Sequence, residues 1–315
     1  MLDRVLGAAA ALSLVLGTAA APSGPKAKVE LTFQDPEIVE SSGLVADGDL
    51  FVTVNDSGDS GRVFAVARTG RTVGVTSWAD EPVDDESLAP AGPGEVWVGD
   101  TGDNSRARDS ITVRRVPYGV GDREVTPATY QLVYPDRAHD AETLMANPRT
   151  GQLFVVSKDI FGGTTYAAPR RLSADHPNEL KAVADGFTFA TDGSFFPDGK
   201  HYVVRGYTNA TVYSFPDHEP LASFPLPTQD QGEGISVGPD DQLYLSTEGQ
   251  FTDVLRMRLP KDVAAAMKPP QPAAAVESEP TPQEQQQPVW PWLVGGGIAF
   301  VVGGGWLLLR RGQAS

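Results

Sequence analysis

Acidic residues recur along this chain at a nearly constant distance before an apolar segment of strand-like composition. Each stands nine to eleven residues before such a segment. They are Glu40, Glu86, Glu142, Asp192 and Glu233. If the five segments are equivalent repeats around one axis, the carboxylates meet there and repel one another unless a cation or protons compensate. Clustered carboxylate oxygens suit calcium or another divalent cation. The alternative is structural: each acid caps a tight turn or binds the backbone of the next repeat.

Polar and charged residues end the same apolar segments, where a buried strand would otherwise stay apolar. They are Asn55, Asp56, Asp100, Lys158, Arg205 and Glu248. Charges of both signs at matching places in different repeats predict a ligand pocket, whose cationic groups bind a carboxylate, a phosphate or sugar hydroxyls. Salt bridges between repeats are the alternative.

Residues for nucleophilic catalysis are scarce in the sequence. The chain has serines but no G-x-S-x-G elbow. Of its four histidines only His139, in RAHDAET, adjoins a candidate acid. His139 is therefore a weak candidate for a catalytic base, and a turn residue is the alternative. The catalytic residues are otherwise unknown.

The elements that carry these residues are short strands. Between residues 28 and 260, alternating runs such as LFVTV, LFVVS and LYLST are bounded by Gly, Pro, Asp or Asn. The strands that follow the five acids start 46, 57, 48 and 42 residues apart. Repeats of this length predict an all-β fold over residues 28–262, a β-propeller with five four-stranded blades, or alternatively six. The VELTF segment is expected to complete the last blade.

Composition limits the classes of ligand and the forces that hold the fold. The chain of 315 residues has no cysteine and a formal net charge of −16. Disulfides and thiolate zinc sites are therefore excluded, and burial with sheet pairing must stabilise the domain. Nucleic acid is not expected as a partner, because binding its phosphates requires clustered Lys and Arg.

Both ends of the chain resemble targeting or anchoring segments. Residues 1–21 are expected to be a signal peptide, and residues 263–288, rich in Pro, Gln and Glu, an extended stalk. Residues 289–309 are uncharged and long enough for one C-terminal transmembrane helix. The arginines of residues 310–315 predict a cytoplasmic tail. The expected location is the cell membrane, with a single-pass chain and an extracellular propeller.

Short motifs resemble known propeller families. The segment QGEGISVGPDDQLYLSTEG, in which Glu233 leads into a strand, resembles the metal-ligand segment of the SMP-30/gluconolactonase-like propellers. The ESSGL…NDSG and GEG…EG patterns resemble secreted bacterial propellers of the esterase-like phytase and SdiA-regulated families. The first resemblance implies a six-bladed propeller in which Glu233 helps to bind a divalent cation. Of that family's metal ligands, only the glutamate has a clear match here, at Glu233.

The sequence favours one function and supports a second. The first is a membrane-anchored extracytoplasmic propeller that binds a small molecule, a glycan or a protein partner at the cell surface. The predicted anchor and stalk and the lack of a clear nucleophile favour it. The second is a divalent-metal-dependent hydrolase of esters, lactones or phosphoesters at the channel mouth, which the five acids, Lys158 and Arg205 favour.

Overall fold

A computed structural model describes residues 25–268 of the chain. The predicted signal peptide, transmembrane helix and cytoplasmic tail, and most of the predicted stalk, lie outside these residues. A short helix, α1 (Lys261–Ala266), follows the last strand. The described structure therefore continues past Asp262, where the sequence analysis ends the propeller. Within residues 25–268, no helix has the length and apolarity that a membrane crossing requires.

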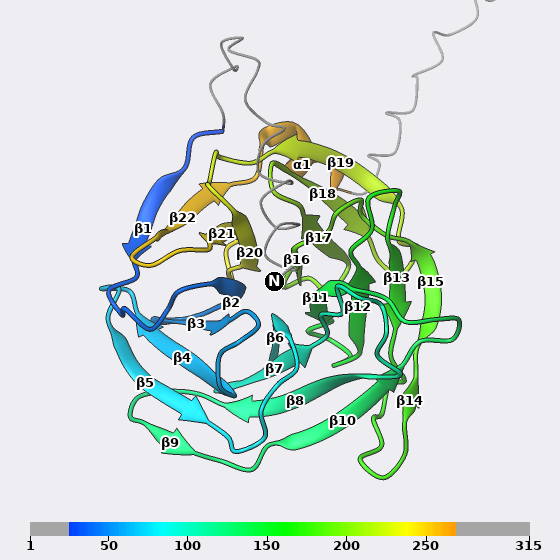
Figure 1. The fold of residues 1–315 in the computed structure, drawn as a ribbon. Helices are drawn as coiled ribbons and strands as arrows, with labels where there is room; N and C mark the ends of the chain where they lie inside the picture. The colour runs from blue at the N-terminus through cyan, green and yellow to red at the C-terminus, as the bar shows by residue number, and fades with distance from the viewer. Residues whose placement is uncertain (1–24, 269–315) are drawn as a thin grey trace, which may run out of the picture. The chain divides into compact units, whose positions relative to one another are not determined.

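The described residues form five β-sheets around a common centre (Figure 1). The first sheet contains β2 (Ser41–Asp47), β3 (Leu50–Asn55), β4 (Arg62–Ala67), β5 (Thr72–Ser77) and β9 (Arg123–Glu124). The second contains β6 (Asp85–Gly92), β7 (Glu95–Asp100), β8 (Ile111–Pro117), β10 (Ala128–Val133) and β14 (Asn178–Glu179). The third contains β11 (Ala141–Ala146), β12 (Leu153–Ser157), β13 (Thr164–Ala167) and β15 (Lys181–Asp185).

The two remaining sheets complete the ring. The fourth contains β16 (Asp192–Phe195), β17 (His201–Arg205), β18 (Asn209–Ser214) and β19 (Pro220–Pro225). The fifth contains β20 (Gly232–Val237), β21 (Gln242–Thr247), β22 (Asp253–Arg258) and β1 (Lys28–Thr32). Each sheet is a four-stranded antiparallel blade, and β9 and β14 add two-residue parallel pairs to the rims of the first two. The prediction of an all-β propeller with five blades is confirmed, and the six-bladed alternative is wrong.

The first strand of each blade lies at the centre of the ring. These inner strands contact one another in the order β2, β6, β11, β16, β20 and back to β2. The outer strands form the rim (Figure 1). Five separate clusters of buried apolar side chains fill the five interfaces between neighbouring blades. The fold is thus stabilised by sheet-on-sheet packing repeated around the axis.

The ring is closed by a strand from the start of the chain. Strand β1 pairs antiparallel with β22, so that the first and last parts of the described chain share one blade. Leu31 and the following Phe33 are almost fully buried in the cluster between the fifth and first blades. The prediction that the VELTF segment completes the last blade is confirmed.

Candidate functional site

Strand register brings the two predicted sets of polar residues to one mouth of the central channel. In each blade the first residues of the inner strand pair with the last residues of the second strand. The pairs are Ser41 with Asn55, Asp85 with Asp100, Ala141 with Ser157, Asp192 with Arg205, and Gly232 with Thr247. Residues that precede an inner strand and residues that follow a second strand therefore lie at the same end.

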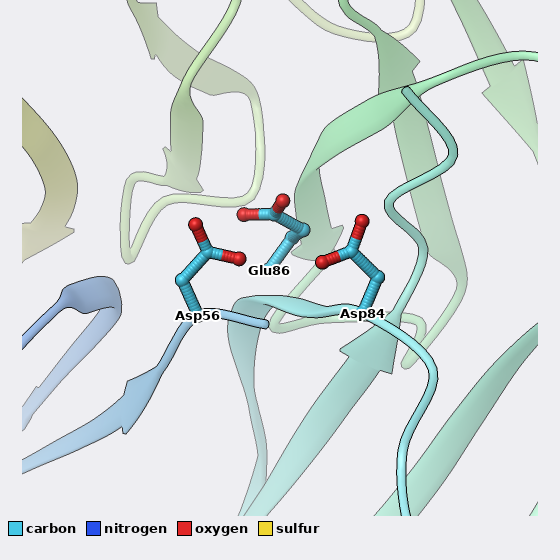
Figure 2. Close-up of side chains that lie close together, drawn as sticks. All are labelled: Asp56, Asp84 and Glu86. Atoms are coloured by element: carbon cyan, nitrogen blue, oxygen red, sulfur yellow. The ribbon is translucent and has the colours of Figure 1, made fainter. Parts of the chain in front are cut away.

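Three carboxyl groups from the first two blades form a compact cluster at this mouth. One ligand oxygen from each of Asp56, Asp84 and Glu86 lies within 4.8 Å of the other two. Asp56 follows β3, Asp84 precedes β6, and Glu86 is the second residue of β6 (Figure 2). Asp84 and Glu86 are 8 % and 3 % exposed, and Asp84 Oδ1 is buried without a hydrogen-bond partner in the described protein.

The close approach of these acids makes them hard to ionise. Burial, followed by the neighbouring Asp56, raises the pKa of Asp84 to about 7. Burial, followed by the charges of Glu142, Asp56 and Asp84, raises the pKa of Glu86 to about 11. Ligand oxygens on opposite sides of a calcium ion are about 5 Å apart, because each Ca–O distance is about 2.3–2.6 Å. The cluster therefore fits a divalent cation in donor type and in spacing.

Asn55 and Asp100 hold the segments that enter the first two inner strands. Asn55 Oδ1 accepts hydrogen bonds from the N–H groups of Val39 (3.0 Å) and Glu40 (3.2 Å). Asp100 Oδ1 likewise accepts from the Asp84 N–H (3.1 Å). Both side chains are 2 % exposed. The two residues occupy matching places in their blades, and each fastens the segment that enters the inner strand.

A lysine from the third blade, Lys158, forms a salt bridge with the inner-strand acid Glu142. Lys158 Nζ forms a salt bridge with Glu142 Oε1, and the Tyr207 hydroxyl lies 3.3 Å from the same nitrogen. The Nζ atom also lies 5.3 Å from the ring centroid of Phe189 and 5.5 Å from that of Tyr207. Burial is the largest single influence and lowers the pKa of Lys158, but Glu142, with Tyr207 and Glu233, together raise this pKa above the ordinary value. The lysine is therefore charged.

Glu142 and Glu233 are buried carboxyl groups with a free oxygen. Each has one oxygen, Oε2, without a hydrogen-bond partner in the described protein. Burial raises the pKa of Glu142 to about 7, although Lys158 opposes the shift. Burial, followed by the charge of Glu142, raises the pKa of Glu233 to about 8. Both groups can exchange a proton near neutral pH. Glu248 lies near them, and burial with the charges of Asp56 and Glu40 raises its pKa.

Asp192 and Arg205 lie inside the wall between the fourth and fifth blades. Asp192 accepts hydrogen bonds from the N–H groups of Gly193 (2.7 Å) and Ile235 (2.8 Å), and is fully buried. Arg205 is fully buried as well, and its guanidinium donates to the carbonyls of Gly206 (3.1 Å) and Gly234 (2.9 Å). Both side chains bind backbone groups, and Asp192 crosses to the next blade. This is the structural alternative that the sequence offered for the acids.

Glu40 and Ser42 show how the first blade departs from the second, third and fifth. Glu86, Glu142 and Glu233 each follow the first paired residue of an inner strand, and Ser42 holds that place in β2. The Ser42 hydroxyl lies 3.0 Å from Glu86 Oε2. Glu40 instead precedes β2, one residue before the paired Ser41.

His139 belongs to an aromatic group beside the mouth. Its Nε2 atom lies 3.0 Å from Asp136 Oδ2 and 2.8 Å from the Tyr166 hydroxyl. Its ring packs edge-on against Tyr134 with centroids 4.9 Å apart. His139 is 7 % exposed. Its contacts with Asp136, Tyr166 and Tyr134 are those of a structural residue.

Cavities occur at both ends of the inner strands. One of about 480 Å³ is lined by residues at the far ends of inner strands, among them Gly92, Ala146 and Val237, together with Trp97 and Phe195. Its lining contains no carboxylate, so the titratable groups described above lie at the other end. The acidic and basic side chains of the mouth and this cavity are therefore separate features of the propeller.

Several residues of this mouth were not among the sequence candidates. Asp84, Tyr207 and Phe189 are the main ones. Asp84 belongs to the run Asp84–Glu86, and three consecutive acids before a strand are a signal that could have been used. The two aromatic residues gave no such signal, because nothing in the local pattern separates them from core residues.

Comparison with known proteins gives similarities to solved structures and no match in sequence. No protein-family model and no curated protein matches its sequence. A gluconolactonase from Xanthomonas campestris is 14% identical over 70% of this chain and 72% of its own, with a TM-score of 0.47. A protein of Bacteroides uniformis, provisionally described as a 6-phosphogluconolactonase, is 17% identical over 70% of this chain and 68% of its own, with a TM-score of 0.39. The five sheets of residues 25–268 themselves define the chain as a five-bladed propeller with an acidic channel mouth.

Proposed function

We propose that this protein binds a divalent cation at Asp56, Asp84 and Glu86 and, through it, a small oxygen-rich molecule at the channel mouth. The observation that carries the proposal is the cluster of three carboxyl groups within 4.8 Å, two of them almost fully buried. Burying several acids together is unfavourable without a compensating charge, and a bound cation supplies that charge. Calcium is the first choice because carboxylate oxygens are its usual ligands.

Lys158 and its aromatic neighbours supply the second half of this site. A charged ammonium group between Phe189 and Tyr207 binds carboxylate or hydroxyl oxygens, and the two rings offer apolar faces to the rest of the molecule. The two rings lie with centroids 5.8 Å apart at an interplanar angle of 48°. A sugar acid, lactone or similar compound has oxygens for both the cation and the lysine.

A second candidate function is hydrolysis of an ester, lactone or phosphoester in the same place. The observation that favours it is the pair Glu142 and Glu233, whose pKa values of about 7 and about 8 suit proton transfer at neutral pH. Each also has a free oxygen that can accept a proton from water. A bound divalent cation would polarise the bond to be cleaved. Lys158 and Tyr207 would orient the substrate.

Calcium titration of the full chain tests the proposal. We expect isothermal titration calorimetry to show one site per chain. The combined substitution Asp84→Asn and Glu86→Gln should weaken binding at least tenfold, because it removes two anionic ligands. Glu179→Gln, which alters an exposed acid of β14, is the matched control and should bind as the parent does. Failure of the parent chain to bind calcium, magnesium or manganese would exclude the cation site.

Substrate tests distinguish binding from hydrolysis. A panel of lactones, carboxylic esters and phosphoesters is incubated with the calcium-loaded chain and with chelator. Turnover that disappears with chelator and in Glu233→Gln supports the hydrolase. Saturable binding of the same compounds without turnover supports the binding protein.

We further infer a cell-surface location from the predicted signal peptide and the predicted membrane span at residues 289–309. The propeller would then face outward and meet a small molecule, a glycan or a surface protein. Protease treatment of intact cells tests this arrangement. Loss of the propeller from intact cells supports it, and full protection until the cells are lysed contradicts it.

A further inference from the structure

The cavity of about 480 Å³ at the far ends of the inner strands is formed by the second, third, fourth and fifth blades. We call it the far-end cavity. Its volume lies within the range of small-molecule sites, about 300–1,000 Å³. Most of its lining is apolar, and the larger apolar residues are Trp97, Phe195, Val237, Pro90, Pro148 and Pro197. The far-end cavity therefore differs in chemistry from the acidic mouth.

Small residues at matching places in two blades leave the space for this cavity. In each blade the last residue of the inner strand pairs with the first residue of the second strand. Phe195 and Val237 hold this place in the fourth and fifth blades. Gly92 and Ala146 hold it in the second and third. The far-end cavity thus opens where the repeat has its smallest side chains.

Two aromatic side chains of the lining are held in place by other rings. The Trp97 ring packs edge-on against Tyr130, with centroids 5.7 Å apart. The Phe195 ring lies 5.3 Å from that of Tyr202 and 5.4 Å from that of Phe215, centroid to centroid. Aromatic rings prefer offset or edge-on contact with further rings. Trp97 and Phe195 therefore offer fixed surfaces that suit an aromatic ligand.

The polar side chains of the lining are engaged by the protein itself. Asn147 donates to a backbone carbonyl (3.0 Å) and accepts from a backbone N–H (2.9 Å). Among the described residues that line the cavity, Arg115 alone carries a charge, and it forms a salt bridge with Glu95. Ser194 Oγ accepts from the Val237 N–H (3.3 Å), which leaves its O–H free to donate. The lining therefore suits an uncharged ligand with at most a small polar substituent.

The apolar side chains around the cavity can be reached from solvent. Pro90 and Pro148 are exposed, and Trp97 and Val237 are half-buried. Apolar side chains gathered around one hollow mark binding grooves more often than apolar residues scattered over a surface do. A ligand that covers them removes apolar surface from water, which favours binding.

We propose that the far-end cavity binds a small uncharged aromatic molecule. Its ring would lie against Trp97 and Phe195, and the prolines of the rim would contact its edges. A hydroxyl or carbonyl oxygen on the ligand would accept a hydrogen bond from Ser194.

This inference does not depend on the cation site. None of Asp56, Asp84 and Glu86 lines the far-end cavity, and neither does Lys158. The propeller would then bind two chemically different ligands, one at each end of its inner strands. Removing the cation should leave the aromatic ligand bound.

Equilibrium dialysis of the full chain against 2-naphthol tests this inference. The probe is aromatic and uncharged at pH 7, and chelator in the buffer keeps the acidic cluster from contributing. We expect saturable binding at one site per chain. Ala146→Leu and Val237→Phe should each weaken it at least fivefold, because both substitutions fill the far-end cavity. Ala182→Leu, at an exposed alanine of β15 outside the cavity, is the matched control and should leave binding unchanged.

A charged probe with the same rings, 2-naphthalenesulfonate, tests the preference for uncharged ligands. It should bind more weakly than 2-naphthol, and tighter binding of the sulfonate overturns the proposal. Absence of saturable 2-naphthol binding overturns it as well. So does equal affinity in Val237→Phe and Ala182→Leu, because the probe would then bind elsewhere. Circular dichroism confirms that the variants fold, and Val237→Phe, at a half-buried position, decides the test if Ala146→Leu does not.

Discussion

At the scale of single residues, the mouth combines buried acids with one partly buried lysine, Lys158. Lys158 and Glu142 form a salt bridge with side chains 15% and 8% exposed. Such pairs gain little over apolar residues, because desolvating the charges offsets their attraction. Removing one partner is costly, because it leaves the other charge buried and unpaired. The stability of variants at Lys158 and Glu142 therefore shows whether the two side chains carry opposite charges in the fold.

Replacing the lysine alone should destabilise the fold more than replacing the pair. Lys158→Met leaves Glu142 without its cation, and we expect the free energy of unfolding at pH 8 to fall by about 3 kcal/mol. Lys158→Met combined with Glu142→Gln removes both charges and should recover at least half of the loss. Urea denaturation of the three chains measures this. Equal stability of the single and double variants would show that the two groups are not coupled.

The buried acids also predict how stability depends on pH without bound metal. The pKa of Glu233 is about 8 and that of Glu142 about 7, against about 4.3 for glutamate in an unfolded chain. Between these values the folded chain binds more protons than the unfolded chain, so the free energy of unfolding decreases as pH rises. Stability should fall from pH 5 to pH 8.5.

Thermal unfolding in chelator across this pH range measures the effect. Glu233→Gln should flatten the curve, because the amide does not titrate, and should be more stable than the parent by at least about 1 kcal/mol at pH 8.5. Calcium should reduce the slope in the parent chain if the ion compensates the acids. A parent chain that becomes more stable from pH 5 to pH 8.5 would contradict the raised pKa values.

At the scale of elements, the loop after β7 sets the position of Asp84. Gly102 lies so close that a Cβ atom there would be 2.2 Å from Asp84 Oδ2 and 2.4 Å from Asp84 Cγ. The Gly102 N–H also donates to the Asp84 carbonyl (3.2 Å). The loop and the acid are therefore packed against each other, and only glycine fits.

Gly102→Ala should weaken cation binding without adding or removing a charge. The methyl group forces the Asp84 carboxyl group to move away from the loop, and we expect calcium affinity to fall by about tenfold with a small change in melting temperature. Gly121→Ala, in the loop between β8 and β9, is the control, because a Cβ there has open space although the left-handed backbone strains it. Calorimetric titration compares the two. Unchanged affinity in Gly102→Ala would mean that Asp84 is not a ligand.

The alternation of apolar residues and the composition of the turns were enough to predict the strands. The position of the candidate site could not be predicted in this way, because it depends on the register in which the strands pair. The runs LFVTV, LFVVS and LYLST lie within β3, β12 and β21, because apolar residues flanked by Gly, Asp and Asn form short strands with tight turns. A register shift between Asp85 and Ser87 decides which acid of the run Asp84–Glu86 faces the mouth. Such a bulge has no recognisable pattern in the amino-acid sequence.

The sequence also could not predict which of the charged residues are buried. Arg205 is the last residue of β17, whereas Lys158 follows the last residue of β12, and only Lys158 reaches the mouth. The guanidinium of Arg205 fills the space beside Gly232, where a Cβ would lie 2.2 Å from its Nη2 atom. This packing joins the fourth and fifth blades, and residues far apart in the sequence determine it.

At the scale of the whole propeller, stability depends on closing the ring. The five interfaces between blades are packed in the same way, and the last of them is completed by β1 and the residue that follows it. Without β1, the outer edge of β22 would be unpaired and the cluster around Phe33 and Leu31 would be open to water. An unpaired strand edge is also a site of aggregation. Closure therefore protects both the core and the sheet edge.

Removing the closing strand should therefore affect the entire fold. We expect a chain that begins at Gln34 to aggregate or to melt at a much lower temperature than one that begins at Pro25.

Single substitutions in the closing segment test the same point. Phe33→Ala should lower the free energy of unfolding by about 3–5 kcal/mol, because Phe33 is fully buried. Val29→Ala in the same segment should change it by less than about 0.5 kcal/mol, because Val29 is 54% exposed. Urea denaturation and light scattering provide the measurements. Closure by β1 would be unimportant if the shorter chain kept the melting temperature of the longer one, since the blades would then be held by their own packing alone.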